Sequence, residues 1–223
     1  MPTLAGAVRR LTSLRPRIEP AFVVYLEPTS NPIELPDDGV EFHEITSSDD
    51  PLLPRICAGW QLPVAKAALD AGSWDVIVAL KDGEPIGRIW ESFDTVRHRS
   101  AGVPRVRLAD DECFMFDLYV EREHRRSNIG MTMAHHFFEK YKPEAGSGIR
   151  YVYGFISHAN GPSVLWHHSI GFNVVQTMNY LAIGERIKWR IPFSDAPRFG
   201  PMSRRGRHSD PAVQLFGSGL LPR

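Results

Sequence analysis

The sequence reads FDLYVEREHRRSNIG from Phe116 to Gly130, and no other segment says as much about the fold. Aromatic and β-branched residues run up to Val120, which is typical of a strand. A short polar segment follows, and small residues then open a helical pattern. The N–H groups at a helix start are unpaired and its dipole is positive there, so this loop is a candidate cradle for a diphosphate. Arg125 and Arg126 add charge and hydrogen-bond donors for phosphate.

Elements of both kinds surround this segment. Apolar residues recur at helical spacing over 127–141, which predicts an amphipathic helix that Pro143 and Gly146 end. Strands are expected at 22–26, 40–45, 74–80, 85–92, 113–120, 151–156, 174–183 and 185–191. Helices are expected over about 50–71, with a break near Leu62-Pro63, and over 162–169, where Gly171 is a left-handed stop. This order predicts an α/β fold: a central mixed, largely antiparallel sheet flanked by helices.

The loop resembles the phosphate-binding motif of the GNAT superfamily of acetyltransferases. That motif is Arg/Gln-x-x-Gly-x-Gly/Ala after a strand, and the matching residues are Arg125, Asn128 and Gly130. Asn128 stands in place of the first glycine, and asparagine tolerates a left-handed backbone better than other side chains. The resemblance implies that the loop binds the pyrophosphate of acetyl-CoA.

A second segment, from Asn160 to Phe172, is similar to the family's Asn-x-x-Ala-x-x-Leu-Tyr-x-x-x-Gly-Phe. Together the two motifs extend the resemblance over roughly residues 40–190. The family implies that the strand end pairs with the pantetheine amides and that Asn160 contacts the pantetheine arm. The residues expected to bind the coenzyme are Leu118, Tyr119, Val120, Arg125, Arg126, Ser127, Asn128, Ile129, Gly130, Met131 and Asn160.

Three residues are candidates for proton transfer. His167 occupies the place where the family usually has a tyrosine that protonates the departing thiolate, and the alternative is a histidine that only packs there. Phe114 stands where the family often has a basic glutamate. Glu112, on the same strand face, and Asp117, on the opposite face, are therefore the candidates for the base. An ordered water or Glu91 from the neighbouring hairpin are alternatives.

Composition limits the other function classes. Twenty-six basic and 26 acidic residues balance, so binding to nucleic acid or to an anionic membrane is not favoured. His135 and Glu139 have helical ligand spacing, but no further ligand accompanies them, so no metal is expected. Cys57 and Cys113 do not form a disulfide framework, and no run is apolar enough for a membrane helix, which predicts a cytoplasmic protein.

The sequence divides into an N-terminal lead-in with one strand (1–39), a GNAT-like domain (40–192) and a flexible basic C-terminal tail (193–223). The predicted function is transfer of an acetyl group from acetyl-CoA to an amine of a small molecule or a protein. The alternative is a CoA-binding regulatory module with little turnover. The expected partners are acetyl-CoA and the acceptor, and a homodimer is one option for its assembly.

Overall fold

The structure is a computed structural model that describes residues 16–26, 39–59, 61–96, 106–125, 127–157, 160–183 and 187–190. The predicted C-terminal tail and Arg126 lie outside these residues. The chain forms two compact units. The core unit comprises Leu26–Val96 and Arg107–Gly154, and the second unit comprises Met1–Tyr25, Arg97–Val106 and Phe155–Arg223.

The core unit holds a five-stranded sheet in the order β8-β7-β4-β3-β2. Its strands are β2 (Glu41–Ile45), β3 (Trp74–Lys81), β4 (Glu84–Ser92), β7 (Glu112–Val120) and the first residues of β8 (Tyr151–Ser157). The pairings of β2 with β3, β3 with β4 and β4 with β7 are antiparallel, whereas β7 and β8 run parallel. The predicted mixed, largely antiparallel sheet is thus confirmed.

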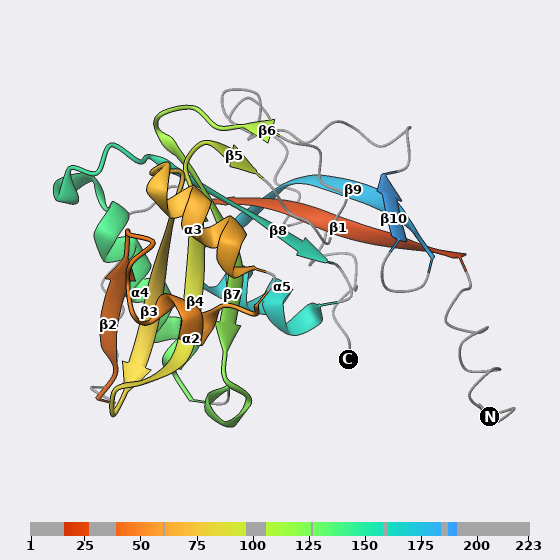
Figure 1. The fold of residues 1–223 in the computed structure, drawn as a ribbon. Coiled ribbons are helices and arrows are strands. Elements are labelled where there is room, and N and C mark those ends of the chain that lie inside the picture. Colours follow the sequence, from red (N-terminus) through yellow and green to blue (C-terminus); the bar gives the residue numbers. More distant parts are fainter. Residues whose placement is uncertain are drawn as a thin grey trace, which may run out of the picture. The chain divides into compact units, whose positions relative to one another are not determined.

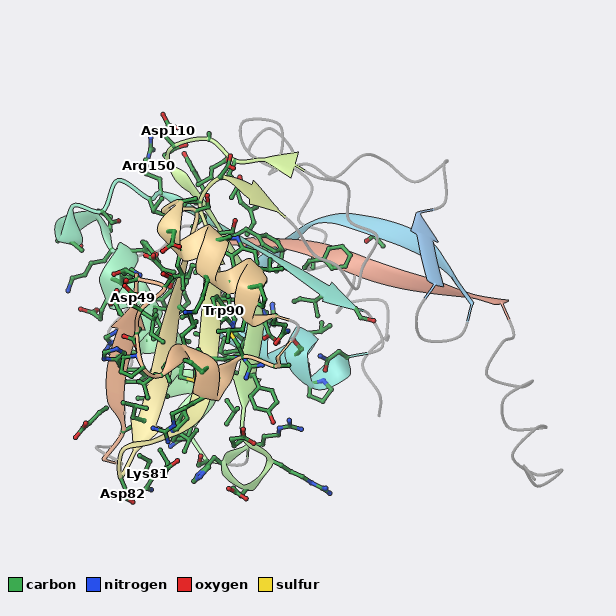
Figure 2. The ribbon with its side chains drawn as sticks, in the orientation of Figure 1. Asp49, Lys81, Asp82, Trp90, Asp110 and Arg150 are labelled. Atoms are coloured by element: carbon green, nitrogen blue, oxygen red, sulfur yellow. The ribbon has the colours of Figure 1, made fainter. Side chains whose placement is uncertain are left out.

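Helices cover both faces of this sheet (Figure 1). The helices α2 (Leu53–Ile56) and α3 (Leu62–Asp70) pack on one face, over a cluster that contains Val76, Val78 and Trp90. Figure 2 shows Trp90 among the side chains that fill this layer. The helix α4 (Ile129–Tyr141) contacts β3 and β4 from the other face. It is followed by the short turn η2 (Pro143–Ala145), after which Gly146 is left-handed (φ 70°).

The turn between β3 and β4 has the backbone that its residue types favour. Asp82 and Gly83 join β3 to β4, and both have positive φ (52° and 77°), the backbone of a hairpin turn that matches strand twist.

The ladder between β4 and β7 contains a bulge, because Arg88 pairs with Tyr119 while Trp90 pairs with Phe116. One extra residue on β7 is accommodated there, and Asp117 takes the left-handed conformation (φ 47°).

The second unit contains β1 (Pro16–Leu26), the helix α5 (Gly161–Ser169), β9 (Asn173–Ile183) and β10 (Ile187–Arg190). Its strands follow the order β10-β9-β1, and both pairings are antiparallel. Strand β1 begins at Pro16, earlier than the apolar run at 22–26 indicated, because β9 is long enough to pair with the polar residues as well. Gly171 follows α5 with φ 96°, as its position predicted.

Two further short strands, β5 (Thr95–Val96) and β6 (Val106–Arg107), flank residues 97–105, which are not described. This part of the chain is polar, and no strand was predicted in it. Within the described ranges, no helix combines the length and the apolar character that crossing a bilayer would require.

Gly87 sets the distance between α4 and the sheet. A Cβ atom at this position would lie 2.7 Å from Met133 Sδ and 3.1 Å from the carbonyl oxygen of Tyr119. We expect Gly87→Ala to lower the free energy of unfolding by about 1–3 kcal/mol, because the helix or the bulged strand must shift. Urea unfolding measures this. Gly59→Ala is the matched control, since a Cβ there meets nothing within 4 Å, and equal losses in both variants would contradict the close-packing role.

Candidate active site

The end of β7 and the loop after it form the centre of the candidate site. The segment η1 (Arg122–His124) is a single turn that leads from β7 towards α4. The backbone N–H of Glu121 donates to the carbonyl oxygen of Ile86 at 2.8 Å, which extends the contact between β7 and β4 into the loop. The predicted succession of strand, tight loop and helix is therefore present.

Tyr119 connects the strand end with the loop. The guanidinium carbon of Arg88 lies 4.7 Å from the centre of its ring, and that of Arg125 lies 5.3 Å from it. The hydroxyl of Tyr119 donates to Glu121 Oε2 at 3.0 Å. Arg125 is held further, because its Nε–H donates to the carbonyl oxygen of Val120 at 2.8 Å. The side chain of Arg125 is therefore oriented by the strand end, and no hydrogen bond from its Nη atoms is found among the residues that the structure describes.

The start of α4 presents backbone donors. Met131 and Thr132 donate their N–H groups to the carbonyl oxygen of Asn128. For the N–H groups of Asn128, Ile129 and Gly130, no acceptor is found within the residues that the structure describes. Such groups at a helix N-terminus attract anions. The arrangement fits the predicted diphosphate cradle, and Arg125 precedes Asn128 by three residues in the chain.

Asn128 does not adopt the left-handed backbone conformation that asparagine tolerates better than other side chains. Its φ is −75° and its ψ is 5°, so the loop turns with a right-handed backbone at this position. The turn is supported instead by Ser127, whose N–H and hydroxyl both donate to the carbonyl oxygen of His124. A glycine is therefore not required at position 128 for the loop to form.

The two candidate bases lie in different environments. Glu112 is buried at the start of β7, where Oε1 accepts from the hydroxyl of Tyr153 at 3.2 Å and Oε2 accepts from the N–H of Ala109 at 2.9 Å. The side chain of Asp117 is 40% exposed and stands at the bulge, where it forms an ion pair with Arg88 at 2.9 Å. Of the two carboxylates, only that of Asp117 lies next to the residues expected to hold the coenzyme.

Asn160 and His167 belong to the second unit. Asn160 caps α5, where its Oδ1 accepts from the N–H of Ser163 at 3.4 Å. His167 is buried, and its Nδ1 lies 2.7 Å from the carbonyl oxygen of Ser163, so the ring donates from Nδ1. Burial lowers the pKa of His167 to about 4, although this hydrogen bond opposes the shift. At neutral pH the imidazole is therefore uncharged.

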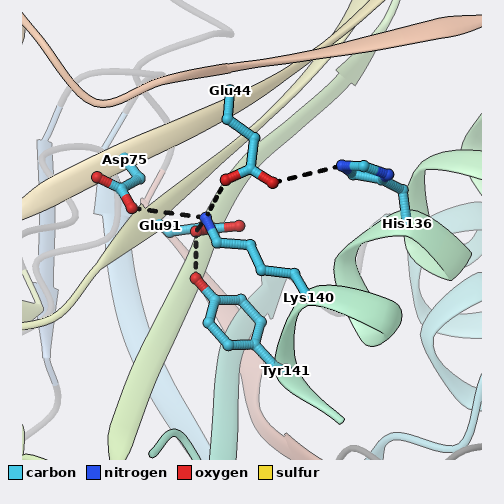
Figure 3. Close-up of polar contacts among 6 residues, drawn as sticks. All are labelled: Glu44, Asp75, Glu91, His136, Lys140 and Tyr141. Carbon is cyan, nitrogen blue, oxygen red and sulfur yellow. Dashed lines mark hydrogen bonds and ion pairs between the residues drawn. The ribbon is translucent and has the colours of Figure 1, made fainter. Parts of the chain in front are cut away.

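A second polar cluster lies between α4 and the sheet (Figure 3). Lys140 stands at its centre, 2.9 Å from Glu91, 3.0 Å from Glu44 and 3.5 Å from Asp75. The remaining members are Tyr141, whose hydroxyl donates to Glu91 Oε2, and His136, which lies 3.5 Å from Glu44. The sequence suggested Glu91 only as an alternative base and did not predict this cluster, because its residues come from four separate elements.

Burial and the neighbouring charges shift the pKa values of three side chains in this cluster. Glu91 is fully buried, and its Oε1 has no hydrogen-bond partner among the described residues. Burial raises the pKa of Glu91 to about 7, although Lys140 and Tyr141 oppose the shift. Burial alone would lower the pKa of Lys140, but Glu91 and Glu44 raise it above its ordinary value. Burial lowers the pKa of His136, against the influence of Glu44.

The described residues also contain His135 and Glu139, the pair with helical ligand spacing. Glu139 forms an ion pair with Lys142. Across the part of the chain that is described, no three side chains of the His, Cys, Asp or Glu type gather as a metal site would need. The absence of a metal stays a prediction.

Comparison with known proteins identifies the family. The model of the acetyltransferase (GNAT) family matches residues 41–172, which is more than half of the chain. No curated protein matches. Among solved structures, a Drosophila protein has a TM-score of 0.51 at 12% identity, over 82% of this chain and 58% of its own. A tandem GNAT protein from the clavulanic acid biosynthesis pathway has a TM-score of 0.48 at 16% identity, over 78% of this chain and 56% of its own. The chain thus spans little more than half the length of either structure.

The Glu91 cluster predicts an unusual dependence of stability on pH. The pKa of Glu91 is raised in the folded state, so the folded chain binds a proton that the unfolded chain has lost between pH 4.5 and about 7. The contribution of Glu91 to the free energy of unfolding is fully present below pH 4.5. It then falls by up to roughly 1.4 kcal/mol per pH unit and is lost once the pH has risen through 7.

We expect Glu91→Gln to flatten this dependence, because the amide imitates the protonated carboxyl group. Urea unfolding at pH 5, 6, 7 and 8 compares the slopes. Glu84→Gln is the control, since Glu84 is exposed and its carboxylate pairs with Arg55 on the surface. Parallel curves for the wild-type chain and Glu91→Gln would rule out the protonation of Glu91 in this range.

Proposed function

This chain belongs to the acetyltransferase (GNAT) family, and we propose that it transfers an acetyl group from acetyl-CoA to an amine by direct attack. The observation that carries this proposal is the start of α4. The N–H groups of Asn128, Ile129 and Gly130 are without an acceptor among the described residues, and Arg125 is oriented beside them. Both kinds of donor suit a diphosphate, which is the anchor of CoA.

The edge of β7 suits the pantetheine arm. The pairs between β7 and β8 are Glu112–Tyr151, Cys113–Val152 and Phe114–Tyr153, whereas β7 continues to Val120. Among the described residues, no pair of the ladder with β8 lies beyond Phe114 on this edge of β7. We expect the amides of pantetheine to pair with this edge, with the thioester beside Leu118–Val120.

The reaction begins when the acceptor ammonium loses a proton. Asp117 is the proposed base, since its carboxylate is partly exposed at the bulge. The neutral nitrogen attacks the thioester carbonyl carbon, and a backbone N–H of Leu118–Val120 stabilises the oxygen that becomes negative. The carbon–sulfur bond then breaks, and the CoA thiolate takes up a proton equivalent to the one that the nitrogen releases. Positioning and desolvation of the amine supply much of the rate.

A second function is favoured by one observation. Phe114 is 1% exposed in the place where the family often has its basic glutamate, and Glu112 is engaged by Tyr153 and Ala109. A site without an efficient base would bind CoA as a regulatory module with little turnover. Release of CoA in the presence of an amine panel separates this function from the acyltransferase.

The location in the cell also stays a prediction. Cys57 and Cys113 are both free thiols, which supports a reducing compartment such as the cytoplasm.

We expect the double variant Arg125→Ala, Gly130→Glu to lose acetyl-CoA affinity by more than about 100-fold, because a guanidinium is removed and a negative charge is placed at the helix start. Isothermal calorimetry measures the affinity, and urea unfolding checks that the fold persists. Arg150→Ala is the matched control, because Arg150 lies over Tyr151 much as Arg125 lies over Tyr119. An unchanged affinity in the double variant would refute the phosphate site.

The neutral state of His167 leads to a prediction about the rate. We expect His167→Phe to change kcat by less than about threefold, since a group with a pKa of about 4 is a minor proton donor at pH 7. The pH–rate profiles of the wild-type chain and of His167→Phe should have the same shape. A large loss of kcat with unchanged acetyl-CoA affinity would instead establish His167 as the acid.

A further inference from the structure

Arg88 and Asp117 form an ion pair that leaves part of each group unused. Arg88 donates from Nε at 3.1 Å and from Nη2 at 2.9 Å, and both bonds end on Asp117 Oδ2. No hydrogen bond to Asp117 Oδ1 or from Arg88 Nη1 is found among the described residues. Within the described part of the chain, the pair therefore leaves one carboxylate oxygen and several guanidinium N–H groups without a partner.

The pair stands on the face of the sheet that α2 covers. Arg88 and Trp90 are two residues apart on β4 and point to the same face, where Trp90 contacts α2 and α3. Cys57, the residue after α2, lies close enough for both charges to influence its pKa, which burial raises. The ring of Phe116 stacks on Trp90 next to the bulge. Two opposite charges thus border an aromatic layer.

Fold stability does not account for this pair. An ion pair with a partly exposed carboxylate contributes little to the free energy of unfolding. A residue other than glycine in the left-handed region is an uncommon feature that often marks a functional position, and Asp117 has φ 47°. The extra residue on β7 turns Asp117 towards Arg88, so the bulge serves to place the charges.

We propose that Arg88 and Asp117 recognise the acceptor as a zwitterion of the α-amino-acid type. The acceptor carboxylate binds the free N–H groups of Arg88, and its amino group binds Asp117 Oδ1. This assignment rests on the proposed acetyl transfer, which places the thioester beside Leu118–Val120.

The spacing of the charges supports this class of acceptor. In an α-amino acid, two bonds of about 1.5 Å separate the nitrogen from the carboxylate carbon. Arg88 and Asp117 are directly adjacent on the protein, because Arg88 Nη2 donates to Asp117 Oδ2, so their two charges can meet both charged groups of a compact zwitterion. A guanidinium binds a carboxylate through two parallel hydrogen bonds, so Arg88 selects this group by geometry as well as by charge.

The first test compares the common L-amino acids with their decarboxylated amines as acceptors, with CoA release as the readout. At least one amino acid should be acetylated with a kcat/KM at least roughly tenfold above that of its amine, the size of effect expected for a charge-assisted bond. Equal or better acetylation of the amines across the panel overturns the proposal.

The second test uses variants of the pair. Arg88→Met should raise KM for the preferred amino acid by roughly 10- to 100-fold and leave KM for its amine within about threefold. Arg88→Lys should keep part of the preference for the amino acid over its amine. Lysine retains the positive charge but lacks the paired N–H donors of the guanidinium. Arg55→Met is the matched control, since Arg55 pairs with Glu84 on the surface and should leave both values unchanged. Equal effects of Arg88→Met on both acceptors would reduce Arg88 to a structural residue.

The third test detects acceptor binding without turnover. Cys57 is partly exposed and Cys113 is fully buried, so a thiol reagent at mildly alkaline pH labels Cys57. The preferred amino acid should slow this labelling in the wild-type chain, with or without CoA, and should not slow it in Asp117→Asn. Protection by the amine or by the deaminated acid to the same extent overturns the proposal. Absence of acetyl-CoA binding in calorimetry would refute the proposed acyl transfer. If CoA binds but the amino acid does not protect Cys57 from labelling, only the proposed class of acceptor is refuted.

Discussion

The bulge in the ladder between β4 and β7 organises the candidate site. Phe116 pairs with Trp90 and Tyr119 pairs with Arg88, so Phe116 and Tyr119 face the same side although an odd number of positions separates them. A regular strand would have turned Tyr119 to the side of α4. Tyr119 instead meets Arg88 and Arg125 at once, and this connects the loop with the aromatic layer under α2.

The helix α4 has to lie close to this bulged ladder for its N-terminus to serve the site. Gly87 permits the approach, since a side chain there would meet Met133 and the carbonyl oxygen of Tyr119. At the other end of α4, Lys140 and Tyr141 bind Glu91 of β4. One end of the helix is thus positioned by the absence of a side chain, and the other by polar contacts that a buried carboxylate requires.

Local patterns predicted nearly all the elements, because each depends on neighbouring residues. Asp82-Gly83 determines a hairpin turn, and the periodicity of 127–141 determines a helix. The loop between β7 and α4 is also local, so its position in the chain could be predicted. The pairing of Arg88 with Asp117 and that of Glu91 with Lys140 could not, because they depend on strand register and on which helix face meets the sheet. The start of β1 at Pro16 was missed for the same reason, since its partner lies in β9.

Strand alternation separates two kinds of charge in the core unit. Arg88 and Glu91 are three residues apart on β4, so they point to opposite faces. A carboxylate with a pKa of about 7 has the value that suits a base at neutral pH. However, Oε2 of Glu91 is held by Lys140 and Tyr141 on the side of α4, whereas the thioester would lie beside the bulge. The raised pKa of Glu91 therefore reflects burial beneath a helix, and the proposed base remains the partly exposed carboxylate of Asp117.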